Sequence, residues 1–228
     1  MKCSVYIATS VDGYIATSDG GVDWLHTAGD LEADMGSEDM GFRDFMDSVD
    51  CMIMGRKCME MISNMNLTPE QWIYGDMPIF VLSNTVKEAP ENLRGKVEMY
   101  SGDIKELTLR LEKNGYTHAY IDGGSTITSF LNHGLISEMI ITKAPVLLGE
   151  GLPLFGKINK KIKLENTKTK SFSNDFYQFK CSVNYLSRQM HSDSEKRRSF
   201  LALLFAAGDL RRCTCYKAFF KRRCLWKG

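Results

Sequence analysis

Two short segments of the sequence carry residues that suit the binding of a phosphate group. The first is residues 54–58 (Met-Gly-Arg-Lys-Cys), where an apolar run turns directly into a helical pattern. A glycine at such a junction lets a ligand approach the backbone closely, and the start of a helix offers free N–H groups. The side chains of Arg56 and Lys57 add positive charge. The segment therefore favours an anionic ligand.

The second segment is residues 121–126 (Ile-Asp-Gly-Gly-Ser-Thr), which also lies between an apolar run and a helical pattern. Paired glycines in this position would let a pyrophosphate lie against the backbone. Taken singly, each segment is equally well described as a simple turn between a strand and a helix. The chain also lacks the Gly-x-Gly-x-x-Gly fingerprint of a Rossmann domain. Two such segments in one chain, one of them basic, favour a dinucleotide only modestly.

The elements that must position these segments follow from apolar runs that alternate with helical patterns. Strands are expected at residues 3–9, 51–54, 79–82, 97–100, 118–121 and 138–148. Helices are expected at 38–48, after Gly55, at 104–113 and after residues 123–124. Two final runs, 161–170 and 176–186, alternate in polarity and predict an antiparallel hairpin. This order predicts an α/β fold with a mostly parallel sheet that ends in antiparallel strands.

A long segment without a clear periodic pattern, residues 10–37, separates the first strand from the first helix. It contains five glycines and many acidic residues. A loop of this length in a small domain is usually functional or mobile.

Composition indicates a globular protein with an appendage. Of the 228 residues, 43% are hydrophobic and 25% charged. The start of the chain has no apolar stretch typical of a signal peptide, and no run approaches the length of a membrane span. Seven cysteines in irregular positions indicate reduced thiols rather than disulfides or a metal site. These features predict a cytoplasmic protein with no metal.

Residues 188–228 differ from the rest of the chain. They hold 11 Lys/Arg and 3 Asp/Glu, a net charge of +8, whereas the whole chain has a net charge of +1. Three basic clusters surround a short apolar run at 199–207, and the cysteines here lack zinc-finger spacing. A basic amphipathic segment can bind membrane surfaces or nucleic acid. The favoured interpretation is a disordered extension without a function of its own.

The motifs and their order resemble dihydrofolate reductase and its relatives, which include the reductase domain of riboflavin biosynthesis. The matching segments are 10–16 (Ser-Val-Asp-Gly-Tyr-Ile-Ala), 24–25 (Trp-Leu), 53–57 (Ile-Met-Gly-Arg-Lys), 81–84 (Val-Leu-Ser-Asn), 121–124 (Ile-Asp-Gly-Gly), 130–131 (Phe-Leu) and 140–142 (Ile-Ile-Thr). The resemblance implies a three-layer fold over residues 1–187. It also implies NADPH along the carboxyl edge of the sheet, where ligands of open α/β sheets bind.

Most residue roles come from this resemblance alone. Ala8 and Ile15 would flank the nicotinamide, and Trp24 would lie on the substrate side. Ser83 and Asn84 would meet the adenosine 2′-phosphate, although the same two residues are also what a strand-ending turn contains. The other implied cofactor contacts are Gly55, Arg56, Lys57, Cys58, Leu82, Ile121, Gly123, Gly124, Ser125 and Thr126.

Reduction of a C=N bond needs a proton donor as well as a hydride. By resemblance, this acid falls on Asp39, which would lie near the start of a helix and point at the pocket, with Thr142 as its neighbour. Glu38, Asp34 and Asp30 are competing candidates. All four could instead be solvated acids that stabilise the start of the helix.

One departure from dihydrofolate reductase concerns the substrate. The family's arginine that grips the folate glutamate is replaced here by Met77, which cannot form a bidentate ion pair. The loop at 17–37 is also longer and more acidic than the family's usual loop. The chain lacks the deaminase domain of the riboflavin enzyme and its Asp-x-Pro-x-Leu motif after Met61. The sequence fits the stand-alone relatives of the riboflavin reductase best, and the segment 145–155 also resembles theirs.

The sequence thus predicts an NADPH-dependent reductase of a small pteridine- or pyrimidine-like heterocycle. The alternatives are a true dihydrofolate reductase and a non-catalytic nucleotide-binding protein. No specific nucleic-acid partner and no membrane span are expected, and a homodimer stays open.

Overall fold

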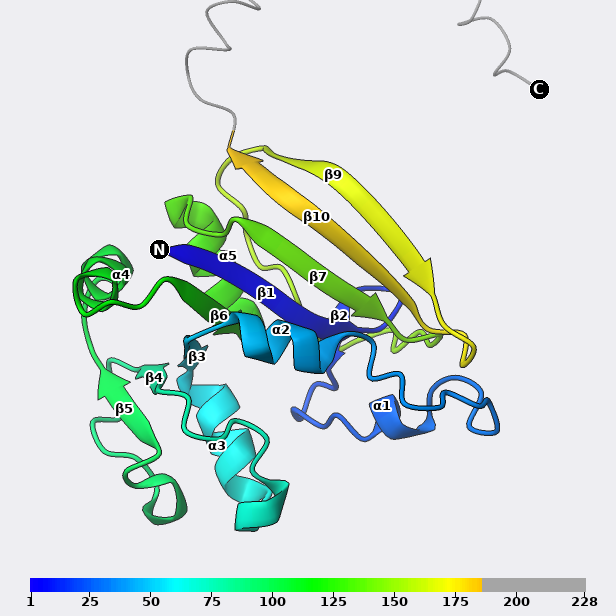
Figure 1. The fold of residues 1–228 in the computed structure, drawn as a ribbon, viewed down its shortest axis with the longest axis horizontal. Coiled ribbons are helices and arrows are strands. Elements are labelled where there is room, and N and C mark those ends of the chain that lie inside the picture. The colour runs from blue at the N-terminus through cyan, green and yellow to red at the C-terminus, as the bar shows by residue number, and fades with distance from the viewer. Residues whose placement is uncertain (186–228) are drawn as a thin grey trace, which may run out of the picture. The chain divides into compact units, whose positions relative to one another are not determined.

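An eight-stranded sheet forms the middle layer of the part of the chain that the computed structural model describes, residues 1–185 (Figure 1). The strands are ordered β5-β4-β3-β6-β1-β7-β10-β9. Their bounds are β1 Lys2–Thr9, β3 Cys51–Gly55, β4 Ile79–Leu82, β5 Val97–Tyr100, β6 His118–Asp122, β7 Glu138–Lys143, β9 Ile162–Ser171 and β10 Tyr177–Tyr185. Two short strands, β2 (Tyr14–Ala16) and β8 (Leu152–Pro153), pair separately.

The strands from β5 to β7 all run parallel, so their carboxyl ends meet at one edge of the sheet. β10 pairs antiparallel with β7, and β9 pairs antiparallel with β10. This confirms the predicted α/β class, the mostly parallel sheet and the antiparallel hairpin at the end of the domain.

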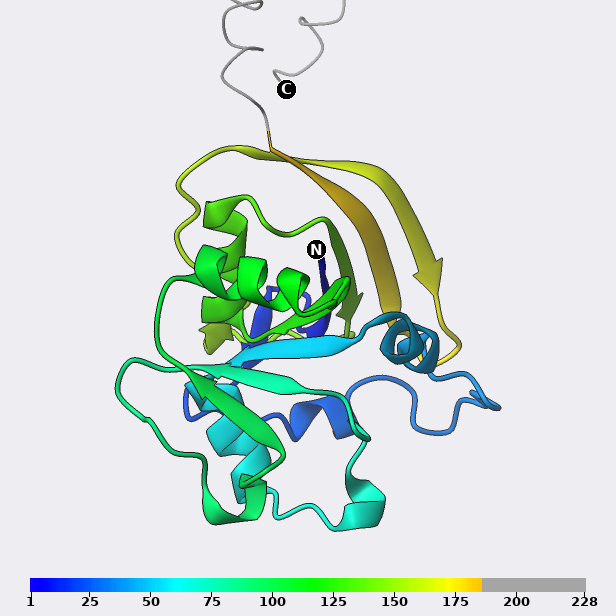
Figure 2. The ribbon, with the colours of Figure 1, turned by 60° about the vertical axis from the view of Figure 1, so that its left-hand side comes forward.

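Helices cover both faces of the sheet, as the two views in Figures 1 and 2 show. The helices are α1 (Trp24–Thr27), α2 (Phe42–Ser48), α3 (Arg56–Asn64), α4 (Ile104–Lys113) and α5 (Gly124–His133), with 3₁₀ turns at Pro69–Gln71 and Glu91–Leu93. Apolar residues of α4 and α5 pack on one face in a single core with Val5, Ile53 and Ile121. Residues of α2 and α3 pack on the other face, around Met52 and Met54. The result is the three-layer arrangement that the resemblance implied.

Two elements differ from the sequence predictions at their boundaries. The helix expected from residue 38 begins at Phe42, because Met40 and Gly41 have positive φ angles of 58° and 83° that interrupt helical geometry. The strand expected over 138–148 ends at Lys143, and Pro145 follows two residues later. Proline has no N–H to donate to a neighbouring strand, so it cannot continue the ladder.

The long loop between β2 and α2 is anchored at the carboxyl edge of the sheet. Its apolar side chains, among them Trp24 and Met35, pack against Ala144 after β7 and against Phe172 and Phe176 at the tip of the hairpin. A methyl group on Gly29 would overlap the carbonyl oxygen of Asn174, so the loop and the hairpin tip are in direct contact.

Within residues 1–185, every helix is too short or too polar to cross a membrane. The predicted basic tail, 188–228, and the exact boundary at 187 lie outside the described residues.

Candidate active site

The two glycine segments that stood out in the sequence lie next to each other at the carboxyl edge of the sheet. β3 leads directly into α3, and β6 leads directly into α5. The two strands are parallel neighbours, with Met54 opposite Asp122. Although α3 and α5 cover opposite faces, both therefore begin at the same edge of the sheet, where the first turn of a helix has N–H groups without helical partners.

The approach of these two junctions is so close that only glycine fits. A methyl group on Gly55 would lie 2.9 Å from Oγ1 of Thr126, and one on Gly123 would lie 2.5 Å from Sγ of Cys58. Gly123 also has a φ of +89°, which side chains rarely adopt. The contacts bring Gly55, Cys58, Gly123 and Thr126 together, as the predicted cofactor site requires. Their roles toward a cofactor stay predictions.

Gly124 is covered by protein. A methyl group on it would lie 2.6 Å from the carbonyl oxygen of Pro153 and 3.2 Å from Cδ1 of Ile15. The paired strands β2 and β8 thus lie directly on the start of α5. This places Ile15 beside the glycine junction, and it gives Gly124 a packing role of its own.

Asp12 fixes that cover in place. Its carboxylate accepts hydrogen bonds from the backbone N–H groups of Leu148 (3.2 Å) and Gly149 (2.8 Å), and from the hydroxyl of Ser10 (2.5 Å). These bonds hold the pKa of Asp12 below its usual value. The turn after β1 and the segment before β8 are thereby joined, so β2 and β8 stay on α5.

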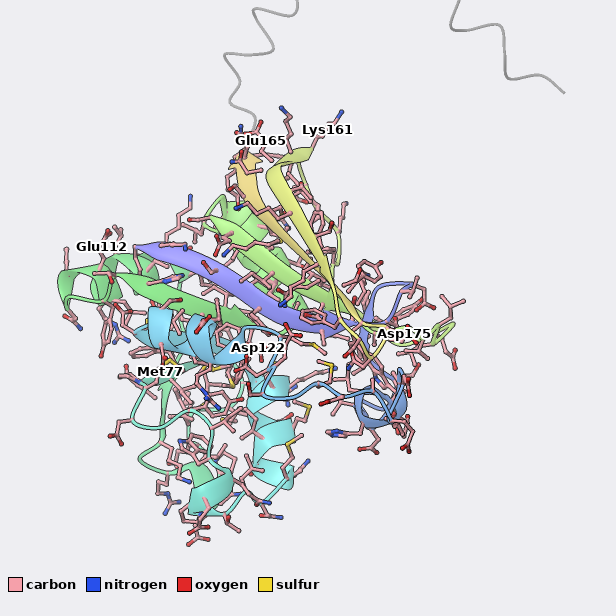
Figure 3. The ribbon with its side chains drawn as sticks, turned by 45° about the vertical axis from the view of Figure 1, so that its right-hand side comes forward. Met77, Glu112, Asp122, Lys161, Glu165 and Asp175 are labelled. Carbon is pink, nitrogen blue, oxygen red and sulfur yellow. The ribbon has the colours of Figure 1, made fainter. Side chains whose placement is uncertain are left out.

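The most unusual titratable group at this edge is Asp122, the last residue of β6. The residue is half-buried, and the desolvation of its carboxyl group raises its pKa, against the opposing effect of hydrogen bonds from Cys58 and from the backbone of Gly123. Figure 3 shows Asp122 beside the start of α3. Its negative charge in turn contributes to the raised pKa values of Tyr74 and Tyr120, after their own burial.

The sequence analysis quoted Asp122 only as part of a glycine motif and did not consider it as an acid. A carboxylate at the end of a buried strand, immediately before a helix, was the available signal. Because a group with a raised pKa keeps its proton to higher pH, Asp122 has the property that a proton donor needs.

Asp39 lies in a different environment from the one expected. Its carboxylate is exposed and accepts hydrogen bonds from the backbone N–H groups of Gly41 and Arg43, both at 2.9 Å. These bonds lower its pKa, so the group stays ionised. Instead of pointing into a pocket, Asp39 closes the turn that precedes α2. This geometry argues against Asp39 as the proton donor.

The competing acids are also occupied on the surface. Asp30 and Asp34 each accept a hydrogen bond from a backbone N–H two residues further along the loop, and Glu38 forms an ion pair with Lys170. All three are exposed. They match the alternative interpretation of these acids as solvated turn and surface residues.

Thr142 belongs to a small polar network at the ends of β1, β7 and β10. Its Oγ1 accepts a hydrogen bond from the side-chain amide of Gln178 (3.0 Å), which also donates to the carbonyl of Met40 (3.0 Å). The hydroxyl of Tyr6 donates to the same carbonyl (3.0 Å). Thr142 thus lies near the Asp39 turn, as expected, and is opposite Ala8 in the sheet. Gln178 links these parts, and the sequence analysis missed it.

Of the residues expected on the cofactor side, some lie beside the glycine junctions, whereas Ser83 forms a turn. Arg56 lies in the first turn of α3 and pairs with Glu60 at 2.5 Å, and Lys57 beside it is exposed. Leu82, at the end of β4, is opposite Gly55 in the sheet. The hydroxyl of Ser83, however, accepts hydrogen bonds from the backbone of Thr85 and Val86, which is the behaviour of a strand-ending turn.

The remaining predicted residues also reach this edge. Ile121 is fully buried in the core beneath the glycines, and Ser125 is exposed on the first turn of α5. Asn84 accepts a hydrogen bond from Ser101. Trp24 begins α1, and its indole nitrogen is buried without a hydrogen-bond acceptor within residues 1–185. In the same range, no group of three or more His, Cys, Asp or Glu side chains is arranged to hold a metal ion.

Comparison with known proteins identifies the family of the chain. The family model described as the RibD C-terminal domain matches residues 2–177. YwjB of Bacillus subtilis (strain 168) is 34% identical over 173 residues, which cover 75% of this chain and 92% of YwjB. A Shewanella sp. PV-4 protein named for riboflavin biosynthesis has a crystal structure that is 37% identical, with a TM-score of 0.73, covering 81% of this chain and all of that one.

Similarity in fold extends to a more distant protein. Dihydrofolate reductase from Enterococcus faecalis, solved in complex with NADP(H) and RAB-propyl, superposes with a TM-score of 0.52 over 80% of this chain and 95% of that one. At 15% identity this likeness concerns the fold alone. It confirms the expected dihydrofolate reductase-like fold.

Proposed function

The chain belongs to the RibD C-terminal domain family, a family of reductases, and from this premise we propose that it is an NADPH-dependent reductase of a small pteridine- or pyrimidine-like heterocycle. One observation carries the proposal: the starts of α3 and α5 meet beside Asp122, a carboxyl group whose pKa is raised. A site for the phosphates of a nucleotide and a source of protons therefore lie side by side.

The residues present fit a dinucleotide phosphate. The close contacts of Gly55 with Thr126 and of Gly123 with Cys58 bring the two helix starts together, and the backbone N–H groups there would bind the phosphates. Arg56 and Lys57 would supply positive charge for the 2′-phosphate, and Ala8 and Ile15 would flank the nicotinamide. The E. faecalis dihydrofolate reductase, with the same fold, is complexed with NADP(H). Bound NADPH would supply the hydride.

The chain's own residues would supply the proton and hold the substrate. Asp122 would carry its proton on a carboxyl oxygen, since desolvation favours the neutral form. It would donate this proton to the ring nitrogen next to the reduced carbon. Gln178 would keep Thr142 and the Met40 carbonyl in fixed positions at the other end of the site. Trp24 and the loop around it would exclude water from the substrate.

The cofactor assignment is tested by titrating the protein with NADPH and NADH. We expect NADPH to bind more tightly, and Arg56→Ala to weaken NADPH about tenfold or more, since a hydrogen bond to a charged group contributes roughly 1.5–3 kcal/mol. Arg110→Ala is the matched control, because Arg110 also forms an exposed ion pair with a glutamate but lies on α4. Equal NADPH affinity of Arg56→Ala and the parent protein would refute the assignment.

The proton donor is tested by comparing Asp122→Asn with Asp39→Asn. Loss of a general acid lowers turnover by roughly 10²- to 10⁴-fold, and we expect this loss for Asp122→Asn only. The parent activity should fall as the pH rises through the pKa of Asp122, and Asp122→Asn should lack this limb of the profile. If Asp39→Asn shows the loss instead, the proton comes from the exposed turn.

A further inference from the structure

We infer that Lys143 is a positioning residue for the nicotinamide of the cofactor and that it acts through the turn that joins β1 to β2. The inference rests on the proposed function, because it concerns the cofactor that this function requires. It depends on three features: the contacts of the Lys143 ammonium group, the residues that the turn holds in place, and the separation of Lys143 from the glycine junctions.

The ammonium group of Lys143 lies against a single turn of the backbone. Lys143 is the last residue of β7 and is opposite Thr9, the last residue of β1. Its Nζ donates hydrogen bonds to the carbonyl oxygens of Ser10 (3.0 Å) and Val11 (3.4 Å). Both carbonyls belong to the turn that leads from β1 into β2. One side chain of the neighbouring strand therefore fixes the direction in which the chain leaves β1.

This ammonium group is held by carbonyl oxygens rather than by a carboxylate. Within residues 1–185, Lys143 forms no ion pair, and its side-chain hydrogen bonds are the two to the turn. The side chain is half-buried, and its desolvation lowers its pKa, whereas the charge of Asp12 raises it. A lysine that served only solubility would extend its charge into water. The bonds to the turn are what offsets the desolvation of Lys143.

The turn sets the spacing between the two residues that would flank the nicotinamide. Ala8 lies in β1 just before the turn, and Ile15 lies in β2 just after it. Ile15 is also fixed from the other side, because a methyl group on Gly124 would lie 3.2 Å from its Cδ1. A shift of the turn would therefore change the space between Ala8 and Ile15 while the start of α5 stays in place.

Lys143 is separated from the junctions where the phosphates would bind. Those junctions follow β3 and β6, and β1 lies between β6 and β7 in the sheet (Figure 1). The hydrogen bonds of Lys143 go to the turn and to neither junction. Its loss should therefore affect the nicotinamide end of the cofactor and leave the phosphate end unchanged.

The test uses two ligands that share the phosphates and differ in the nicotinamide. NADPH carries both ends, whereas 2′-phosphoadenosine 5′-diphosphoribose lacks the nicotinamide. Calorimetry on the full chain measures the affinity for each. Lys143→Met removes the N–H donors and keeps an unbranched stem. We expect it to weaken NADPH about tenfold and to change the affinity for the diphosphoribose by less than about twofold, since the lost bonds come from a charged donor at the nicotinamide end.

Further variants separate the role of the donors from a general effect on stability. Lys143→Arg keeps the charge and offers several N–H donors, so it should regain most of the NADPH affinity. Lys168→Met is the matched control, because Lys168 is an exposed lysine of β9, and it should bind both ligands as the parent protein does. Where Lys143→Met does not fold, Lys143→Gln, which keeps N–H donors without the charge, is measured with the same two ligands and should weaken NADPH alone.

The outcomes separate the inference from the proposed function. Failure of the parent protein to bind NADPH would contradict the proposed function, and the inference would fall with it. If the parent protein binds NADPH, unchanged affinity in Lys143→Met would contradict only the inference. Equal losses for both ligands would also contradict it, since Lys143 would then act on the whole site. The same conclusion follows if Lys143→Arg binds NADPH as weakly as Lys143→Met.

Discussion

Substitution of Gly123 by alanine tests whether the two helix starts are as close as the structure has them. Gly123 has a φ of +89° and a ψ of 133°, a conformation that costs a side-chain-bearing residue roughly 1–3 kcal/mol. The added methyl group would also lie 2.5 Å from Sγ of Cys58, whereas favourable contacts lie at about 3.5–4.0 Å. Relief of such an overlap costs roughly 1–3 kcal/mol. We expect a total loss of about 2–6 kcal/mol in the free energy of unfolding.

Two further variants separate these contributions in urea unfolding. Gly95→Ala is a control for the backbone term alone, because Gly95 has a φ of +81° and no atom within 4 Å of the added methyl group. It should lose about 1–2 kcal/mol. Combining Cys58→Ala with Gly123→Ala removes the overlap and should recover the stability that it costs. This recovery appears as a coupling energy of about 1–3 kcal/mol in the double-mutant cycle.

The same variants report on the cofactor site. Any backbone shift that relieves the overlap moves the N–H groups at the start of α5, so NADPH affinity should fall in Gly123→Ala even where the protein is folded. Equal destabilisation by Gly123→Ala and Gly95→Ala would show that the close approach is absent. Unchanged NADPH affinity in folded Gly123→Ala would show that the phosphates bind elsewhere.

Two other predictions concern pH and the end of the chain. Burial lowers the pKa of His118, which is held between the carbonyl of Ser48 (2.7 Å) and the hydroxyl of Ser4 (2.8 Å). As the pH falls below about 6.5, His118 becomes protonated in the unfolded chain but stays neutral in the folded protein, so the free energy of unfolding should decrease by up to about 1.4 kcal/mol per pH unit. Urea unfolding midpoints at pH 7.5 and 5.5 measure this decrease. His118→Asn should reduce the difference between the two midpoints. We also propose that residues 1–187 form the complete reductase domain, so a chain ending at residue 189 should keep NADPH binding and have a melting temperature within about 5 °C of that of the full chain. A larger decrease in melting temperature, which corresponds to a loss of more than ~1 kcal/mol in the free energy of unfolding, would place the domain boundary further along the chain.

The sequence predicted those parts of the site that depend on local patterns. Gly55 and Gly123 were identified because a glycine between an apolar run and a helical pattern is visible within a few residues. The two glycines lie close together because their strands are neighbours in the sheet, and the α/β class of the fold followed from the alternation of strands and helices. The resemblance supplied the family, which the comparisons confirm.

The parts that sequence reasoning missed depend on burial and on distant contacts. Asp39 and Asp122 are both carboxylates beside a helix start, and only the surrounding side chains decide that one pKa is lowered and the other raised. Gln178 meets Met40 across 138 residues of sequence, and no local pattern marks such a contact. The helix start at Phe42 was misplaced because the positive φ of Met40 has no signature in a non-glycine residue.

The position of the hairpin in the chain has a consequence for how the protein is made. The two glycine junctions are complete once residue 126 has been synthesised, whereas Phe176 and Gln178, which lie just before and within β10 and would hold the substrate side, come near the end of the domain. A protein emerging from the ribosome folds from its N-terminal part onward. The nascent chain would therefore acquire the proposed nucleotide half of the site first, and the strand that completes the proposed substrate half would join the sheet only when translation of the domain is nearly finished.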